Sequence, residues 1–346
     1  MARKLVTIRK ISEIRPIPDA DSIELVIVDG WQCVAQKAMN YKVGDYVFYF
    51  EIDSFLPFSK PEFEFLRPKD GRVTVFNGVE GHRLRTIKLR KQLSQGLLIP
   101  VENWLITGGH VDPDDTEADY SEYWGVQLYE KPLPEQLAGT VRSTFPSFIH
   151  KTDQERIQNM FNILQRRLST NPDEEFEITL KLDGSSMTVY RRDDDYGVCS
   201  RNLSLKENDD NTFWRVAKKE GLFEFLEKTG RNLALQGELM GEGVQGNMES
   251  LIGNYFFLFD IFDIDQGKYL LPAERMALIE GSGIRHAPVL KISKVNHFKS
   301  NDDFLKYAEG PSLCANVREG VVFKSMTDPD FSFKVISNVF LLGEKD

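Results

Sequence analysis

Six short segments rich in β-branched and aromatic residues follow one another at regular spacing early in the 346-residue chain: 5–11, 23–28, 31–35, 46–52, 72–76 and 84–89. Short strands separated by turn residues at such intervals are typical of a small barrel or sandwich. Asp29-Gly30 lies between two of them and matches a two-residue hairpin turn, because glycine tolerates the positive φ that this turn needs. The sequence therefore predicts a small β-barrel domain over residues 1–110.

A connector is expected over residues 111–148. Acidic residues and prolines concentrate there and favour a path along the surface over a core element. These residues are Asp112, Asp114, Asp115, Glu117, Asp119, Glu122, Pro132, Pro134 and Pro146.

A second domain of mixed helices and strands is expected over residues 149–346. A helix is predicted with Thr152 as its N-cap and Glu155 completing a capping box. Its apolar face would be formed by Ile157, Met160, Phe161, Leu164 and Leu168. Strands are predicted at 176–182, 187–191, 255–264, 320–324 and 331–336, with a helical insert near 212–228. The fold class is therefore α+β.

The net charge of -10 argues against a protein that coats nucleic acid through its overall field. The segment 82–91 is nevertheless strongly basic, and Arg83, Arg85, Lys88 and Arg90 could give cationic contacts to a nucleic-acid backbone. An edge strand that carries protective surface charges is an equal alternative.

No apolar run approaches the roughly 18 to 20 residues of a membrane-spanning helix, and the first residues lack the apolar stretch of a secretory signal. We therefore expect a soluble intracellular protein, cytoplasmic or nuclear in a eukaryote, with no membrane partner. Cys33, Cys199 and Cys314 lie far apart, which predicts neither a zinc site nor disulfide bonds. Each cysteine is expected to be buried.

Lys181 lies at the end of a predicted strand, in the sequence Lys-x-Asp-Gly. A free lysine has a pKa of about 10.4, so only about one molecule in a few thousand is neutral at pH 7. A nucleophilic lysine therefore needs neighbouring groups that favour its neutral form. Alone, the short pattern favours a surface Lys-Asp pair at a turn over a nucleophile.

Five further segments follow Lys181 in the chain, and they contain arginine, glutamate, aromatic and lysine residues that can contact a nucleotide: 200–202, 236–247, 255–261, 318–324 and 331–337. Together with Lys181 they resemble the nucleotidyl transferase motifs I, Ia, III, IIIa, IV and V of ATP-dependent ligases and capping enzymes. The resemblance spans about residues 150–342.

The resemblance implies roles for the charged residues. Arg201 would contact the phosphates, Glu238 the ribose or the lysine, and Lys334 would neutralise the α-phosphate. The implied catalytic set is Lys181, Glu238, Glu319 and Lys334. Glu319 would also hold a divalent cation, Mg²⁺ or Mn²⁺, together with a second carboxylate.

That second metal ligand would be Asp183, and ATP is the implied nucleotide cofactor. Phe257 would stack on the adenine, with Phe256 and Phe259 left open as alternatives. The implied ATP-binding residues are Lys181, Leu182, Asp183, Arg201, Glu238, Phe257 and Lys334.

The order of the two domains narrows the resemblance. Capping enzymes and most DNA ligases of this class continue into a C-terminal OB domain, whereas this sequence ends twelve residues after Lys334. OB-like segments lie instead at 43–57 and 93–100, so an OB-like β-barrel precedes the nucleotidyltransferase domain. This arrangement resembles the RNA ligases of the Naegleria and Deinococcus type, as does the segment 151–159.

The resemblance implies a three-step reaction. Lys181 attacks ATP to form lysyl-AMP, the AMP passes to a 5'-phosphate end, and a 3'-hydroxyl then displaces it. The implied partner is RNA or an RNA-containing duplex, and a monomer is expected. A DNA ligase, or a nucleic-acid binding protein with a degenerate ligase domain, are the alternatives.

Two departures from the family pattern stand out. Ile336 occupies a position where many relatives carry a second lysine, so another cation, such as Lys324, would have to replace it. Leu180 stands where several relatives have a glutamate, which leaves adenine selectivity open. The segment 241–246 matches G-x-G-x-x-G, but a β-rich run follows it, so no dinucleotide site is predicted.

Overall fold

The computed structural model describes residues 3–102, 105–106, 111–113, 115, 118–130 and 139–343. Contacts divide the chain into two compact units, Met1–Pro132 with Leu342–Asp346, and Leu133–Leu341. Within the described ranges, no helix has both the length and the apolar character needed to cross a membrane.

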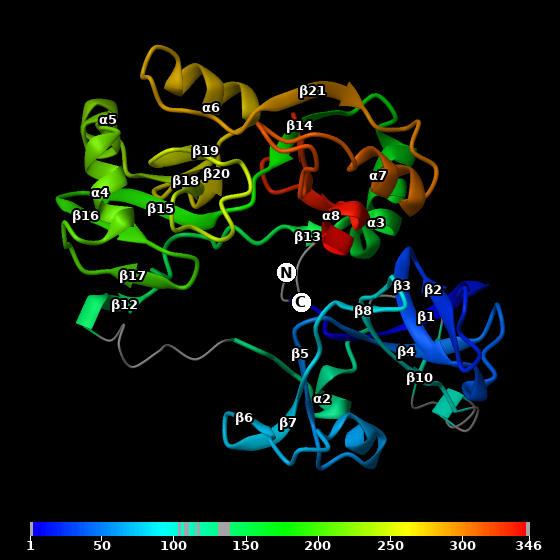
Figure 1. The fold of residues 1–346 in the computed structure, drawn as a ribbon. Helices are drawn as coiled ribbons and strands as arrows, with labels where there is room; N and C mark the ends of the chain where they lie inside the picture. The colour runs from blue at the N-terminus through cyan, green and yellow to red at the C-terminus, as the bar shows by residue number, and fades with distance from the viewer. Residues whose placement is uncertain are drawn as a thin grey trace. The chain divides into compact units, whose positions relative to one another are not determined.

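The first unit is built from antiparallel strands (Figure 1). A five-stranded sheet has the order β10-β4-β1-β2-β3, with β1 (Val6–Pro16), β2 (Ile23–Val28), β3 (Trp31–Gln36), β4 (Tyr46–Glu51) and β10 (Gly96–Pro100). A four-stranded sheet has the order β11-β5-β7-β6, with β5 (Ser54–Pro57), β6 (Thr74–Phe76), β7 (Val79–Arg83) and β11 (Gln127–Leu128). A hairpin, β8 (Ile87–Leu89) and β9 (Gln92–Ser94), and the short helices η1 (Lys37–Met39), η2 (Pro61–Leu66) and α2 (Ser121–Trp124) complete it.

The alternation of apolar residues along β1 and β4 builds the barrel core. Val6, Ile8, Phe48 and Phe50 are buried together with Trp124 of α2. The hairpin between β2 and β3 is confirmed, since Asp29 and Gly30 have φ values of 48° and 80°.

Two predicted strands of the first unit need correction. The segment 84–89 is not one strand, because β7 ends at Arg83 and the amide of Leu84 donates to Ser54 instead. The segment 72–76 is a strand only from Thr74.

The second unit contains two further sheets (Figure 1). The larger has the order β12-β17-β16-β15-β18-β19-β20, with β12 (Val141–Thr144), β15 (Ser185–Arg192), β16 (Asp195–Cys199), β17 (Leu203–Leu205), β18 (Leu233–Gly241), β19 (Asn254–Asp263) and β20 (Lys268–Tyr269). The smaller has the order β13-β23-β22-β14-β21, with β13 (Glu155–Arg156), β14 (Glu175–Lys181), β21 (Val289–Lys294), β22 (Gly320–Ser325) and β23 (Ser332–Ile336). The helices are α3 (Ile157–Thr170), α4 (Thr212–Lys219), α5 (Leu222–Thr229), α6 (Pro272–Ile279), α7 (Asn301–Tyr307) and α8 (Asn338–Gly343).

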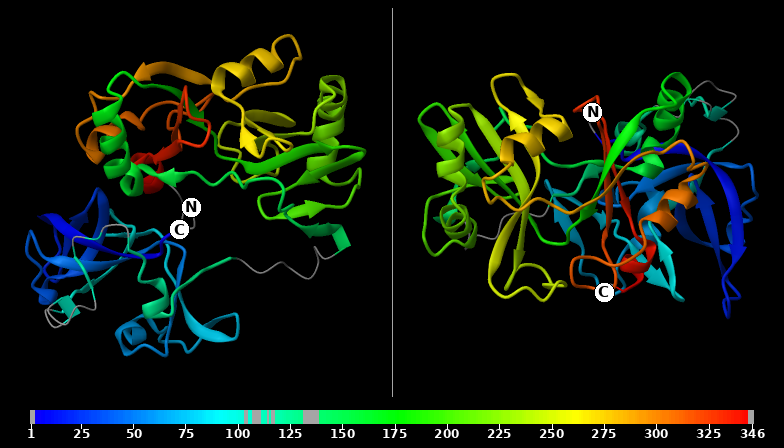
Figure 2. Two further views of the ribbon diagram at one scale, coloured as in Figure 1. Left: turned by 180° about the vertical axis from the view of Figure 1, so that it is seen from behind. Right: turned by 90° about the horizontal axis from the view of Figure 1, so that it is seen from above.

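Each sheet of the second unit buries one face against its own pair of helices, and the two pairs lie at opposite ends of the unit (Figure 2). Trp214 of α4 and Leu226 of α5 pack against the larger sheet. Phe304 of α7 and Leu164 of α3 pack against Phe176 and other residues of the smaller one. Because side chains alternate along a strand, the other face of β14 carries Glu177, Thr179 and Lys181. The nucleophile predicted from the sequence therefore lies on the face turned away from the helices.

The predicted capping box is wrong. Arg156, not Thr152, is the N-cap of α3, and no side chain caps the helix. Glu155 and Arg156 form β13 instead, which pairs in parallel with β23, so strand pairing takes the backbone groups that the capping box would have used. The apolar face predicted for α3 is confirmed.

The helical insert is two helices, α4 and α5, separated by Gly221 in a left-handed conformation (φ 66°). The fully described segment 241–254 contains turns and no helix, which confirms that its G-x-G-x-x-G pattern is not a dinucleotide motif.

The predicted connector contains short elements, α2, β11 and β12. Asp114, Glu117, Pro132 and Pro134 lie outside the described residues. Cys33 and Cys199 are buried as expected, but Cys314 is exposed. It lies in a surface loop before β22, where its backbone amide donates to Glu249 at 2.6 Å.

Candidate active site

Lys181 is the last residue of β14 and pairs with Gly320, the first residue of β22. A side chain at Gly320 would place its Cβ 2.0 Å from the carbonyl oxygen of Val335, so glycine lets β22 and β23 approach. The pairing brings Glu319 beside the lysine, whose Nζ donates to Oε1 at 2.6 Å. The side chains of Lys181 and Glu319 are 25% and 16% exposed, so the ion pair remains within reach of a ligand.

The charge state of Lys181 is set by opposing effects. Burial disfavours the ammonium form, but the carboxylates of Glu319, Glu238 and Asp183 outweigh burial and raise the pKa of the lysine. The ligand-free lysine is therefore a cation held by Glu319. For this lysine to act as a nucleophile, those carboxylates would have to acquire another positive partner.

Glu238 lies on β18, between Ser186 of β15 and Phe257 of β19. Burial raises the pKa of this carboxyl to about 8, against the opposing effect of Lys181. Asp183 and Gly184 form the turn from β14 to β15. A Cβ on Gly184 would lie 2.4 Å from the Leu239 carbonyl oxygen and 2.8 Å from Cγ of Glu238.

A Gly184→Ala substitution is expected to slow adenylylation of the protein by about 100-fold, because the added methyl group must displace Glu238 or separate β15 from β18. Transfer of label from ATP to the protein measures the effect. Gly139→Ala, outside the motif segments, is the matched control, since a Cβ there meets no atom within 4 Å. Equal rates for the two variants would contradict the close-packing argument.

Lys334 lies on β23, opposite Val322 of β22 and Arg156 of β13. Burial, together with the charges of Lys181 and Arg156, lowers the pKa of Lys334 to about 8. Arg156 thus belongs to the same electrostatic cluster as both lysines. Arg156 was not among the site residues expected from the sequence, and the parallel pairing of β13 with β23 reveals its position.

The segment before β13 lines the cluster through three side-chain contacts. Lys151 donates to Asn202 at 3.0 Å, and Thr152 lies 3.1 Å from the hydroxyl of Ser186. Asp153 accepts from Arg201 at 2.9 Å. Arg201 is 62% exposed in this ion pair, so its guanidinium remains accessible to a phosphate.

Apolar residues from both sheets form a cluster next to the charged groups. Its buried members include Leu182, and Phe257 and Phe259 pack against it while staying partly exposed. Phe256 is buried in the core beneath α4 and α5 instead. Of the three candidate rings for a purine, Phe257 and Phe259 therefore remain.

Lys324 is not the missing second cation. Its ammonium group is buried, pairs with Asp260 and donates to the Phe259 carbonyl at 2.6 Å. Arg275, fully buried, joins the same network through Glu177 and Asp260. Lys324 is thus committed to holding the two sheets together. Arg156 lies on β13, the strand that pairs with β23, and is a further cation on the side of β23 that carries Lys334.

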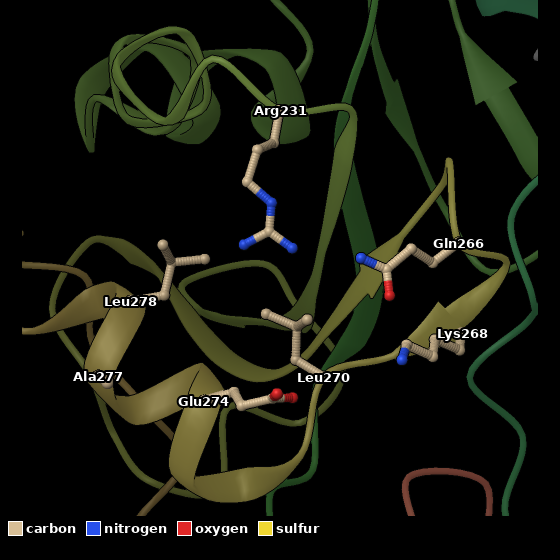
Figure 3. A pocket seen from close by; sticks show the side chains of 7 residues that line it. All are labelled: Arg231, Gln266, Lys268, Leu270, Glu274, Ala277 and Leu278. Atoms are coloured by element: carbon tan, nitrogen blue, oxygen red, sulfur yellow. The ribbon is translucent and has the colours of Figure 1, made fainter.

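A cavity of about 380 Å³ lies elsewhere in the second unit, beside α6 and the hairpin of β19 and β20 (Figure 3). Arg231, Lys268 and Glu274 line it, and none of its residues belongs to the motif cluster. Over the described part of the chain, no group of three or more His, Cys, Asp or Glu side chains is arranged to hold a metal ion.

In the second unit, a lysine at a strand end lies among carboxylates from both sheets and near a second lysine; the first unit is a small β-barrel. This combination is the architecture of a covalent nucleotidyltransferase joined to an OB module. The family comparisons agree. An OB-fold domain model matches residues 5–101, and the RNA ligase model matches residues 174–336. The comparison with curated proteins gives no match.

Solved structures extend the similarity over the whole chain. A variant of Naegleria gruberi RNA ligase without ligand is 44% identical, with a TM-score of 0.80, and covers 98% of this chain and 97% of its own. The same enzyme with pyrophosphate is 44% identical, with a TM-score of 0.80 and 98% of both chains covered. A lysine-to-alanine variant with ATP and Mn is 43% identical, with a TM-score of 0.81 and 99% of both chains covered. The chain belongs to the RNA ligases of the Naegleria type, and the predicted α+β arrangement of an OB barrel followed by a ligase domain is confirmed.

Proposed function

We propose that this RNA ligase uses ATP and Mg²⁺ or Mn²⁺ to join 3'-hydroxyl and 5'-phosphate ends through a lysyl-AMP intermediate on Lys181. The observation that carries the proposal is the 2.6 Å pair between Lys181 and Glu319, surrounded by Glu238, Asp183 and Lys334. Relatives with ATP and Mn, with AMP and Mn, and with pyrophosphate contain the reactants and products of such a step.

The substituted positions of the Naegleria enzyme support these assignments. Its solved variants replace three lysines, two glutamates and one aspartate. Five of these six positions carry the residue types of Lys181, Lys334, Glu238, Glu319 and Asp183.

The carboxylates fit a divalent cation. Asp183 and Glu319 offer two oxygen ligand groups, and Mg²⁺ commonly takes one or two carboxylates and completes its shell with water and substrate phosphate. When bound, the metal would neutralise phosphate charge and compete with Lys181 for these carboxylates, which favours the neutral amine.

In the first step, the Lys181 Nζ forms a bond to the α-phosphorus of ATP while the bond to the bridging oxygen breaks and pyrophosphate leaves. The amine loses its proton before attack. Lys334 and Arg156 would neutralise charge on the α-phosphate, and Arg156 would thereby replace the second lysine of relatives. Phe257 or Phe259 would stack on the adenine beside Leu182. AMP then moves to the RNA 5'-phosphate, and the 3'-hydroxyl displaces it.

The decisive experiment is incubation of the protein with each of the four labelled nucleoside triphosphates and Mg²⁺ or Mn²⁺. A covalent, acid-labile adduct formed from ATP supports the proposal. A protein that binds RNA but forms no adduct under any of these conditions would overturn it.

The pKa of Lys334 predicts a pH effect on ATP binding. Because this pKa is about 8 in the free enzyme, the ammonium that attracts phosphate is lost as the pH rises through 8. The KM for ATP in adenylylation is therefore expected to rise above pH 8 by up to about tenfold per pH unit. Lys334→Arg should hold KM nearly constant, because a guanidinium stays charged. If the KM for ATP rose with pH in the same way in wild type and in Lys334→Arg, this role of Lys334 would be contradicted. Deprotonation of Lys181 is a separate effect, because it changes the rate of attack and not the KM.

A further inference from the structure

The first unit contains an apolar pocket of about 380 Å³, and none of its lining residues is among those assigned to the nucleotidyl transfer step. Residues of η2, β3, β6, β7, β8 and the β9–β10 segment line it, among them Phe65, Leu66, Leu84, Ile87 and Leu89. Three of these apolar side chains are exposed at its rim: Phe65 at 65%, Ile87 at 47% and Leu89 at 38%. Such a concentration of exposed apolar surface around a pocket marks a binding site rather than scattered surface residues.

Phe65 is the most exposed of these side chains. Two residues earlier on η2, Phe63 is fully buried and packs edge-to-face on Phe50 with 5.3 Å between ring centroids. Phe63 therefore anchors the short helix, and Phe65 projects from it. Within the described residues Phe65 contacts no other ring, so its face is available to an external planar group.

The same pocket carries a cation. Arg85 is exposed, lines the pocket, and has no ion pair within the described part of the chain. Its neighbour Arg83 differs: it pairs with Asp53 at 2.5 Å and lies 4.8 Å above the Tyr129 ring. Of these two arginines, Arg85 is thus the one available to a phosphate.

An exposed aromatic ring, an apolar pocket and an arginine match the parts of one unpaired nucleotide. Proteins that bind single strands stack bases on aromatic side chains and hold the backbone with cations. We propose that this pocket binds an unpaired nucleotide of the RNA substrate, with its base on Phe65 and its phosphate at Arg85. The proposal rests on the proposed joining of RNA ends, and the cation favours RNA over an apolar protein partner.

Full-length Phe65→Ala and Arg85→Ala proteins test the proposal against a 5'-phosphorylated single-stranded RNA and the same strand in a blunt duplex. Phe65→Ala is expected to raise the Kd for the single strand by roughly 5- to 100-fold, and Phe65→Trp to restore it. Arg85→Ala should weaken binding and reduce the salt dependence by about one phosphate contact. Val75→Ala, at an equally exposed side chain outside the pocket, should leave Kd unchanged.

A scan with single abasic nucleotides locates the bound base. At one position of the RNA, removal of the base should weaken binding to the wild-type protein as much as Phe65→Ala does. Removal of the same base should not weaken binding to the Phe65→Ala protein any further. An unchanged single-strand Kd in both alanine variants, or an equal loss for the duplex, overturns the proposal. Slower adenylylation of the Phe65→Ala protein in the absence of RNA would also overturn the proposal, because the pocket would then contribute to the transfer of AMP from ATP to the protein. Failure of the wild-type protein to form an adduct would count against the proposed function instead.

Discussion

A Lys181→Ala protein is expected to acquire no AMP from labelled ATP, a loss of about 10³-fold or more relative to wild type. The reason is the pairing of β14 with β22, which places the Nζ of Lys181 2.6 Å from Glu319. Within the described residues, no other lysine Nζ pairs with Glu319. Lys334 lies nearby but on a different strand. Gel analysis after incubation with ATP and a divalent metal measures the adduct.

Lys181→Arg is the matched variant. A guanidinium preserves the positive charge beside Glu319 but cannot become a neutral nucleophile. It should therefore be as inactive as alanine in adenylylation. Both variants should still seal RNA that already carries a 5'-adenylate, because the last step forms no bond to the lysine. Labelling of either variant would remove Lys181 from its proposed role.

Glu319→Gln is expected to slow adenylylation by about 100-fold or more. Loss of this carboxylate has two opposing consequences, and the direction of the rate change shows which of them is larger. It removes one of the charges that raise the pKa of Lys181, which alone would speed attack at neutral pH. It also removes one of the two carboxylates proposed to hold the metal, which slows attack.

Single-turnover adenylylation over a range of metal concentrations separates these consequences. A slower reaction that recovers in part at high Mn²⁺ supports the metal role. A faster reaction at neutral pH would show that Glu319 only restrains the lysine. Glu309→Gln, at an exposed position of the preceding loop, is the control and should match wild type.

Local sequence patterns predicted those features that depend on neighbouring residues. The Asp29-Gly30 turn follows from glycine's tolerance of positive φ, and the apolar face of α3 follows from helical periodicity. The order of the nucleotidyl transferase motifs predicted the family, because several motifs in a fixed order are far more specific than any one of them.

Features that depend on distant pairing could not be predicted in this way. The segment that contains Thr152 and Glu155 matches a capping box, but a strand almost 180 residues later pairs with it and makes Arg156 part of the site. Likewise, nothing near Lys324 in sequence indicates that Asp260 neutralises it. Cys314 has an apolar side chain typical of a core, yet its loop is fixed through its backbone by Glu249.

The position of β23 between β22 and β13 has a consequence for synthesis on the ribosome. β13 is the first strand of the smaller sheet to be translated, but its neighbour β23 is the last strand of that sheet. Until Ser332–Ile336 emerges, β22 has an open edge and Lys334 does not yet exist. A nascent or prematurely terminated chain would therefore lack the cation of the proposed phosphate site, and adenylylation would begin only after the sheet has closed around its final strand.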